Sequence, residues 1–122
     1  MYRWQKRIKF WMWEMVGVPS QWNPVNRGQR LLEEALEAVQ CKEIGLTEEQ
    51  CHDLVRYVYN RPPGVLHMEI GGVIVCLLAF ADATGEDVLT CLTDEVMRIE
   101  RPEVIEKVRA AILRKRNDGV GN

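Results

Sequence analysis

The sequence predicts an all-α protein, a helical bundle. Apolar residues recur three and four positions apart along most of the chain, as they do on one face of an α-helix. No segment alternates apolar and polar residues in the manner of a half-buried β-strand. Proline, glycine and capping residues divide the chain into segments of helical length. With 122 residues, 47% hydrophobic and 28% charged, the chain is expected to form one domain over residues 1–122.

The ends of the expected helices are marked by residues that start and stop helices. Thr47 and Gln50 have the spacing of a capping box, and Gly85 suits the end of a helix. Asp87 suits an N-cap, and Pro102 suits the first position of a helix. Helices are therefore expected over residues 2–15, 25–41, 48–60, 67–84, 88–100 and 102–116, with a frayed end at 117–122.

Cysteine usage and hydropathy exclude several classes of protein. Cys41, Cys51, Cys76 and Cys91 include no CxxC pair, so we expect neither a zinc site nor a thioredoxin-like motif, but a reduced cytoplasmic protein. No uncharged run is longer than the 12 residues of 70–81, fewer than the roughly 20 that cross a bilayer, so no membrane partner is expected. A chain of this size buries only about 65% of its unfolded surface, which favours a homo-oligomer, a dimer or tetramer.

Charge is distributed unevenly along the chain. The net charge is +5 over residues 1–30, −11 over residues 31–106 and +4 over residues 107–122. An acidic middle between basic ends suits the joint binding of divalent cations and phosphate, or it is the ordinary surface of a helical bundle. The basic residues beside the first tryptophans leave open a membrane-surface helix or a nucleic-acid contact, but they are more typical of a solvated face.

The helix expected over residues 25–41 carries the most specific pattern. At 100° per residue, Arg27, Arg30, Glu34 and Glu37 fall within an arc of about 80°. Glu33 lies about 40° from Glu37, and the apolar residues take the opposite side. One stripe thus presents two guanidiniums followed by three carboxylates. The alternative interpretation is a solvated surface with a salt bridge between Arg30 and Glu34.

The helix expected over residues 67–84 adds a further acid. It is apolar on every side from Ile70 to Ala81, which predicts a helix buried by its neighbours. Glu69 lies at its head, and a buried carboxylate needs a partner. The helix N-terminus is one such partner, and a divalent cation shared with Glu34 and Glu37 is the other. Because the donors are carboxylates without His or Cys, this cation is expected to be Mg²⁺ or Mn²⁺.

These residues resemble the motifs of a known family. The run from Arg27 to Val39, followed by Glu69-Ile-Gly-Gly and its apolar helix, resembles the all-α nucleoside triphosphate pyrophosphatases of the MazG-like superfamily. More closely, it resembles the short MazG-like (MazZ-type) proteins of phages. The resemblance covers about residues 5–116. The EExxE motif is intact as Glu33-Glu34-x-x-Glu37, whereas the ExxD motif reads Glu69-x-x-Gly72 and lacks its usual Asp.

The resemblance implies a hydrolase that cleaves a (deoxy)nucleoside triphosphate between its α- and β-phosphates, giving a monophosphate and pyrophosphate. It implies two or more Mg²⁺ or Mn²⁺ ions per site, held by Glu34, Glu37 and Glu69, with Glu33 as an extra ligand or as the base. Pairing of subunits would complete the nucleotide pocket, as it does in the family. The likeness to phage proteins favours dGTP or GTP as substrate, in phage nucleotide metabolism in the host cytoplasm.

Other side chains are candidates for contacts with the substrate. Arg27 and Arg30 suit phosphate oxygens because they are forked donors. Arg98 and Arg101 share a face by i+3 spacing and are further candidates, or else surface residues. Trp11 suits stacking on a base, or packing in the core or a dimer seam. Two other functions stay open, a nucleotide-binding or regulatory protein that has lost catalysis and a nucleic-acid-binding accessory protein.

Overall fold

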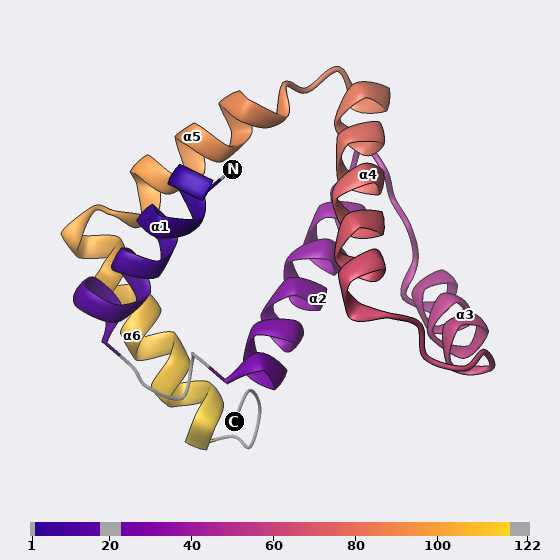
Figure 1. Cartoon of the computed structure of the whole chain (residues 1–122), viewed down its shortest axis with the longest axis horizontal. Helices are drawn as coiled ribbons and strands as arrows, with labels where there is room; N and C mark the ends of the chain where they lie inside the picture. Colours follow the sequence, from indigo (N-terminus) through magenta and orange to yellow (C-terminus); the bar gives the residue numbers. More distant parts are fainter. Residues whose placement is uncertain (1, 18–22, 118–122) are drawn as a thin grey trace. The chain divides into compact units, whose positions relative to one another are not determined.

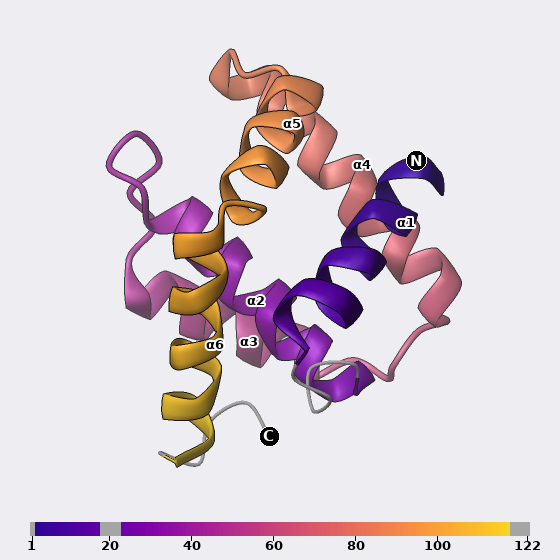
Figure 2. The same ribbon diagram turned by 90° about the vertical axis from the view of Figure 1, so that its left-hand side faces the viewer.

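A computed structural model describes residues 2–17 and 23–117 of the chain. These residues form helices and no strand, so the all-α prediction is confirmed. In order along the chain, the helices are α1 (Tyr2–Phe10), η1 (Trp11–Val16), α2 (Pro24–Gln40), α3 (Glu48–Tyr59), α4 (Leu66–Thr84), α5 (Val88–Ile99) and α6 (Pro102–Asn117) (Figures 1 and 2).

The helix ends follow the local signals in the sequence. The Thr47 hydroxyl accepts a bond from the Gln50 backbone N–H at 3.1 Å, and the Gln50 side chain accepts one from the Thr47 N–H at 2.8 Å. Asp87 accepts a bond from the Thr90 N–H at 2.8 Å. Gly85 ends α4 in the left-handed conformation, with φ of 75°. The sequence predicts a frayed end over residues 117–122, but residue 117 is the last residue of α6. Residues 118–122 lie outside the described residues.

The first helix departs from the prediction at its second half. It is α-helical to Phe10 and then becomes the π-helix η1. Gly17 closes η1 with φ of 65° and donates its N–H to the carbonyl of Met12 at 2.9 Å. Arg109 of α6 donates to the carbonyl oxygens of Met15 and Val16, the last two residues of η1. This side chain therefore caps the C-terminal end of η1.

The chain divides into two compact units, and α2 runs from one into the other. The terminal unit comprises Met1–Ala35 and Leu92–Asn122, and the central unit comprises Leu36–Cys91. The terminal unit has a small core, whose buried members among the described residues are Val16, Asn26, Val96, Val104 and Ile105. Polar side chains also join its distant segments, as where Arg7 donates two bonds to Glu100, at 2.8 and 2.6 Å.

The central unit contradicts the prediction that residues 70–81 are buried. Within its described residues, Ala81 is the one buried residue, and most of α4 is exposed. The helix α4 is apolar, as the sequence indicates, but no other helix of this unit covers it. By length and composition alone, α4 could also cross a membrane. This is weak evidence, because the core helices of soluble proteins pass the same test.

Candidate functional site

The acidic stripe of α2 is held by an arginine of the same helix. Arg30 donates to Glu33 from one guanidinium nitrogen and to Glu34, at 2.6 Å, from the other. The salt bridge that the spacing of Arg30 and Glu34 predicts is therefore present. Because one planar group bonds both carboxylates, the three side chains are held relative to one another.

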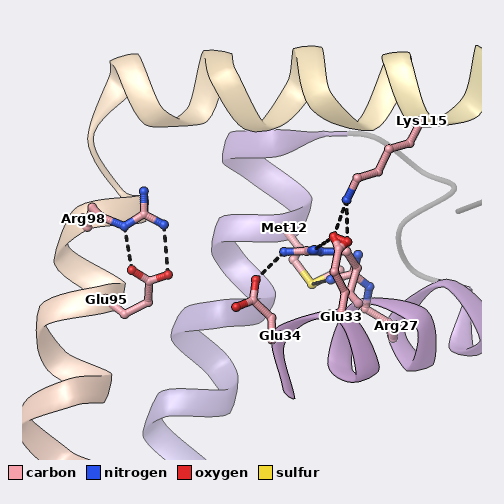
Figure 3. Close-up of polar contacts among 8 residues, drawn as sticks. Met12, Arg27, Glu33, Glu34, Glu95, Arg98 and Lys115 are labelled. Atoms are coloured by element: carbon pink, nitrogen blue, oxygen red, sulfur yellow. Dashed lines mark hydrogen bonds and ion pairs between the residues drawn. The ribbon is translucent and has the colours of Figure 1, made fainter. Parts of the chain in front are cut away.

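A lysine that the sequence did not single out joins this stripe. Lys115 of α6 donates to both carboxylate oxygens of Glu33, at 2.6 and 2.8 Å (Figure 3). The hydrogen bond from Lys115 lowers the pKa of Glu33, as do the charges of Lys115 and Arg30, against an opposing effect of burial. A carboxylate with a lowered pKa is a weaker proton acceptor. Glu33 is thus better suited to orienting its cationic neighbours than to acting as a base.

Arg27 lies one turn before Arg30 and is half-buried. Its guanidinium is 3.9 Å from the sulfur of Met12 in η1 (Figure 3). Burial lowers the pKa of Arg27, and the positive charge of Arg30 lowers it further. Two guanidiniums close enough to affect each other form a region that favours an anion.

Of the second pair of predicted arginines, the structure brings one near the stripe. Arg98 is paired with Glu95 through two bonds, of 2.6 and 2.9 Å, and the charge of Glu34 adds to the raised pKa that this pairing gives Arg98. Figure 3 shows Arg98 and Glu95 in the same view as Glu34. Arg101 instead donates to the carbonyl of Arg98 at 3.3 Å and pairs loosely with Glu103 at 3.7 Å. Within the described residues, these contacts hold Arg101 away from the carboxylates of α2.

The first-helix tryptophans have different surroundings. The indole N–H of Trp11 donates to the carbonyl of Ile99 at 2.7 Å, which fixes this half-buried ring in the packing of the terminal unit. Trp13 instead lines an open hollow of about 480 Å³. The residues that line it are Gln5, Ile8, Lys9, Met12, Trp13 and Arg27. Of the two rings, Trp13 is the better placed to contact a ligand.

The remaining predicted ligands, Glu37 and Glu69, are exposed. In the part of the chain that the structure describes, neither carboxylate has an ion-pair or hydrogen-bond partner. Glu69 lies in the first turn of α4, and its carboxylate rests so close to Gly64 that a Cβ there would collide with it. Gly72 opens onto free space, with nothing within 4 Å of an added Cβ. The N-terminal end of α4 therefore has room around Gly72.

The described residues contain no group of three or more His, Cys, Asp or Glu placed to hold a metal ion. Of the predicted ligands, Glu34 belongs to the terminal unit, whereas Glu37 and Glu69 belong to the central unit. Glu34 and Glu37 are held together by α2. The donor chemistry fits Mg²⁺ or Mn²⁺, since within the described residues Glu37 and Glu69 offer unshared carboxylate oxygens and Glu34 is hydrogen-bonded to Arg30.

Contacts over long sequence separations are the ones the sequence did not reveal. Lys115 is 82 residues from Glu33, and no local spacing connects them. The one signal was the basic tail after residue 107, which fits an acidic partner but does not name it. In comparisons with known proteins, no family model, curated protein or solved structure matches the chain.

Proposed function

We propose that the chain is a metal-dependent hydrolase of a (deoxy)nucleoside triphosphate, most readily dGTP or GTP, that releases pyrophosphate and the monophosphate. The face of α2 is the observation that carries this proposal. It presents the guanidiniums of Arg27 and Arg30, and Arg30 is bonded to both Glu33 and Glu34. Glu37, whose carboxylate is unshared within the described residues, lies about two turns beyond Arg30 on the same helix. On one helix, arginines that suit phosphate oxygens thus precede carboxylates that suit a metal ion.

Arg27 and Arg30 would bind the phosphate oxygens. Arg27 is already partly desolvated, so its bonds to an anion would be stronger than those of a fully exposed arginine. Glu33 accepts a bond from Arg30 and is itself held by Lys115, which limits the freedom that the Arg30 side chain loses on binding. Arg98 is a further cation of the terminal unit, near enough to Glu34 for the two charges to interact.

Glu34, Glu37 and Glu69 would hold the cations in this proposal. When bound, Mg²⁺ or Mn²⁺ offsets phosphate charge and lowers the pKa of a water molecule. The hydrogen bond from Lys115 and the charge of Arg30 lower the pKa of Glu33, and its carboxylate serves to orient these two side chains. Trp13 and Met12, beside Arg27, offer an apolar face for the base. A dimer or tetramer in the cytoplasm, which completes the pocket, is part of the same proposal.

The deciding measurement is pyrophosphate release from each common NTP and dNTP, with Mg²⁺, with Mn²⁺ and with EDTA. We expect release from a few purine nucleotides that EDTA abolishes. Binding of nucleotides without release would favour the regulatory protein. DNA binding with a steep salt dependence, and no release, would favour the nucleic-acid accessory protein.

Glu37→Gln is the sharpest variant of this site. It is expected to reduce metal-dependent turnover by at least about 100-fold while leaving the helical circular dichroism unchanged, because Glu37 is exposed and unpaired within the described residues. Glu43→Gln makes the same chemical change at an exposed residue beyond the end of α2 and should retain activity. Full activity of Glu37→Gln would exclude it as a ligand. Gly72→Asp restores the usual motif and has space for the side chain.

A further inference from the structure

Helix α1 of the terminal unit, indigo in Figure 1, combines aromatic rings and positive charges on one face. At 100° per residue, five exposed side chains fall within an arc of about 120°. They are Tyr2, Arg3, Lys6, Lys9 and Phe10, and we call them the α1 face. The half-buried Trp4, Ile8 and Trp11 lie on the opposite side of the helix, where the Trp11 indole is bonded within the terminal unit.

The cations of the α1 face are not neutralised by acids. Helix α1 has four cations and no acid. Within the described residues, Arg3, Lys6 and Lys9 form no ion pair. Arg7, the fourth cation, lies outside the α1 face and pairs with Glu100. Unpaired cations gathered on one helix attract a polyanion, and each phosphate that they neutralise releases counterions into solution.

The aromatic rings beside these cations are open to solvent. Tyr2 is 70% exposed and Phe10 is 59% exposed. The ammonium of Lys6 lies 4.6 Å from the centre of the Tyr2 ring, so a donor for phosphate stands next to a stacking surface. In the terminal unit, every exposed aromatic residue that the structure describes belongs to α1 or η1. The exposed rings are thus concentrated where the unpaired charge is.

Rings interleaved with cations match the chemistry of a single-stranded nucleic acid. Unpaired bases stack on exposed aromatic rings, while lysine and arginine bind the phosphates between them. At 1.5 Å per residue, Tyr2 and Phe10 are roughly 12 Å apart along the helix axis. This is about the length of three stacked nucleotides, so three cations and two rings fit a strand of that length.

The same arrangement argues against a membrane as the partner. A helix that lies on a membrane keeps its cations on one side and its apolar residues on the other. In α1 the cations and the exposed rings share one side, and the apolar residues of the other side are half-buried. Within the described residues, α1 therefore has no separate exposed apolar side that could enter a bilayer.

We propose that the α1 face binds single-stranded DNA or RNA without sequence preference, with its three cations on phosphates and Tyr2 and Phe10 stacked on bases. This inference does not rest on the proposed hydrolysis, because the α1 face shares no residue with the arginines and carboxylates of α2. Lys9 also lines the hollow beside Trp13, so the test variants leave Lys9 unchanged.

Fluorescence anisotropy of a labelled strand tests the proposal on the full chain. The probe is a DNA strand of about 15 nucleotides and mixed sequence, in EDTA so that metal-dependent hydrolysis plays no part. We expect a dissociation constant of roughly 10⁻⁶–10⁻⁴ M near physiological salt. The logarithm of affinity should fall against the logarithm of salt with a slope of about −2, since three cations contribute about −0.7 each. A dissociation constant above about 1 mM would overturn the proposal.

The rings are tested by replacing Phe10, whose exposure allows substitution without loss of the fold. Phe10→Leu keeps an apolar side chain but removes the ring, and should weaken binding about 5- to 150-fold, the range measured for one stacked base. Phe10→Trp keeps a ring and should retain the affinity. A duplex of the same sequence should bind more weakly than the strand, because its bases are already stacked on one another. Equal binding by the two Phe10 variants, or tighter binding of the duplex, would contradict stacking.

The charges are tested by a matched pair of lysines. Lys6→Gln should make the salt slope less steep by about 0.7. Lys42→Gln makes the same change at an exposed lysine of the central unit and should leave the slope unchanged. Equal effects of the two variants would assign binding to the charge of the whole chain and would overturn the proposal. If Phe10→Leu fails to fold, the comparison of Lys6 with Lys42 decides.

Vesicles of phosphatidylcholine and phosphatidylglycerol separate the strand from a membrane. A bilayer accepts leucine in place of phenylalanine, whereas base stacking does not. We expect the vesicles to bind the chain more weakly than the strand does. Vesicle binding that Phe10→Leu leaves unchanged, without binding of the strand, would assign α1 to a membrane surface and would overturn the proposal.

Discussion

The terminal and central units are both helical, but their helices are stabilised in different ways. In the terminal unit, side chains reach across long sequence separations, as Arg7 does to Glu100 and Trp11 to the carbonyl of Ile99. In the central unit, ion pairs such as Arg56 with Glu49 and Asp53 join residues of the same helix, α3. Tertiary structure in the first unit is thus specified within one chain, whereas the second has mainly local structure.

This difference separates two tasks that a small chain must perform. The terminal unit has its own buried residues and positions the Arg30, Glu33 and Lys115 network. The central unit has one buried residue among those described and exposes α4, although this helix has the highest mean hydropathy of the chain. Apolar surface that a unit does not bury itself is available for association. We therefore expect the terminal unit to be the more stable in isolation and the central unit to depend on a partner.

The largest expected effect comes from removing side-chain volume in each unit. Ile105→Ala in the terminal unit should lower the free energy of unfolding by about 2–5 kcal/mol, because Ile105 is 7% exposed and its truncation leaves a cavity. Ile74→Ala in α4, where Ile74 is 42% exposed, should cost less than about 1 kcal/mol. Guanidinium unfolding followed by far-ultraviolet circular dichroism measures both. If Ile74→Ala lowered the free energy of unfolding as much as Ile105→Ala does, α4 would be buried in solution, and the two units would not differ in this way.

The helices could be predicted from the sequence, but the sequence could not show what packs against α4. Helix ends depend on signals within a few residues, such as the pair Thr47 and Gln50 or the glycine at position 85, and these are present in the sequence. The apolar run of α4 showed that this helix avoids water. It did not show what excludes the water, since a neighbouring helix, a second copy and a membrane all satisfy the same composition. The prediction of intramolecular burial was wrong for that reason.

Acid should lower the free energy of unfolding of the terminal unit, by less than the substitution Ile105→Ala does. Hydrogen bonds from Lys115, Arg98 and Arg7 lower the pKa of Glu33, Glu95 and Glu100, respectively, below the ordinary value of 4.5. A carboxyl group whose pKa is lower in the folded state stabilises folding above its unfolded pKa. This contribution is lost as the pH falls from 4.5 through the lower folded values. Tryptophan fluorescence, to which only the terminal unit contributes, should therefore change in this range.

A double-mutant cycle isolates one of these pairs. Glu33→Gln and Lys115→Gln should show a coupling of about 0.5–1 kcal/mol at pH 7, since both side chains are about one-third exposed and water screens the pair. The coupling should vanish once Glu33 is protonated. A coupling that is unchanged in acid would show that the two side chains interact by packing and not by charge.

Contacts of the site within one helix were predictable from the sequence, whereas contacts between two helices were not. The i,i+4 spacing of Arg30 and Glu34 predicted their ion pair, and the structure contains it. Lys115 comes from a different helix, and its contact with Glu33 depends on how α6 packs in the terminal unit. Trp11 and Trp13 are two residues apart, and the sequence did not separate the ring that hydrogen-bonds to Ile99 from the ring that lines the hollow. The π-helical turn that contains both was not foreseen.

The smallest effects are expected from replacing one glycine of each unit with alanine. Gly28 lies inside α2 with nothing within 4 Å of an added Cβ, so Gly28→Ala should raise the free energy of unfolding by about 0.5–1 kcal/mol. Gly64→Ala gains similar backbone entropy, but its Cβ must displace the Glu69 carboxylate. That carboxylate is the far end of a flexible side chain, so we expect a net change within about 0.5 kcal/mol of zero. Equal stabilisation by both variants would show that Glu69 does not rest on Gly64 in solution.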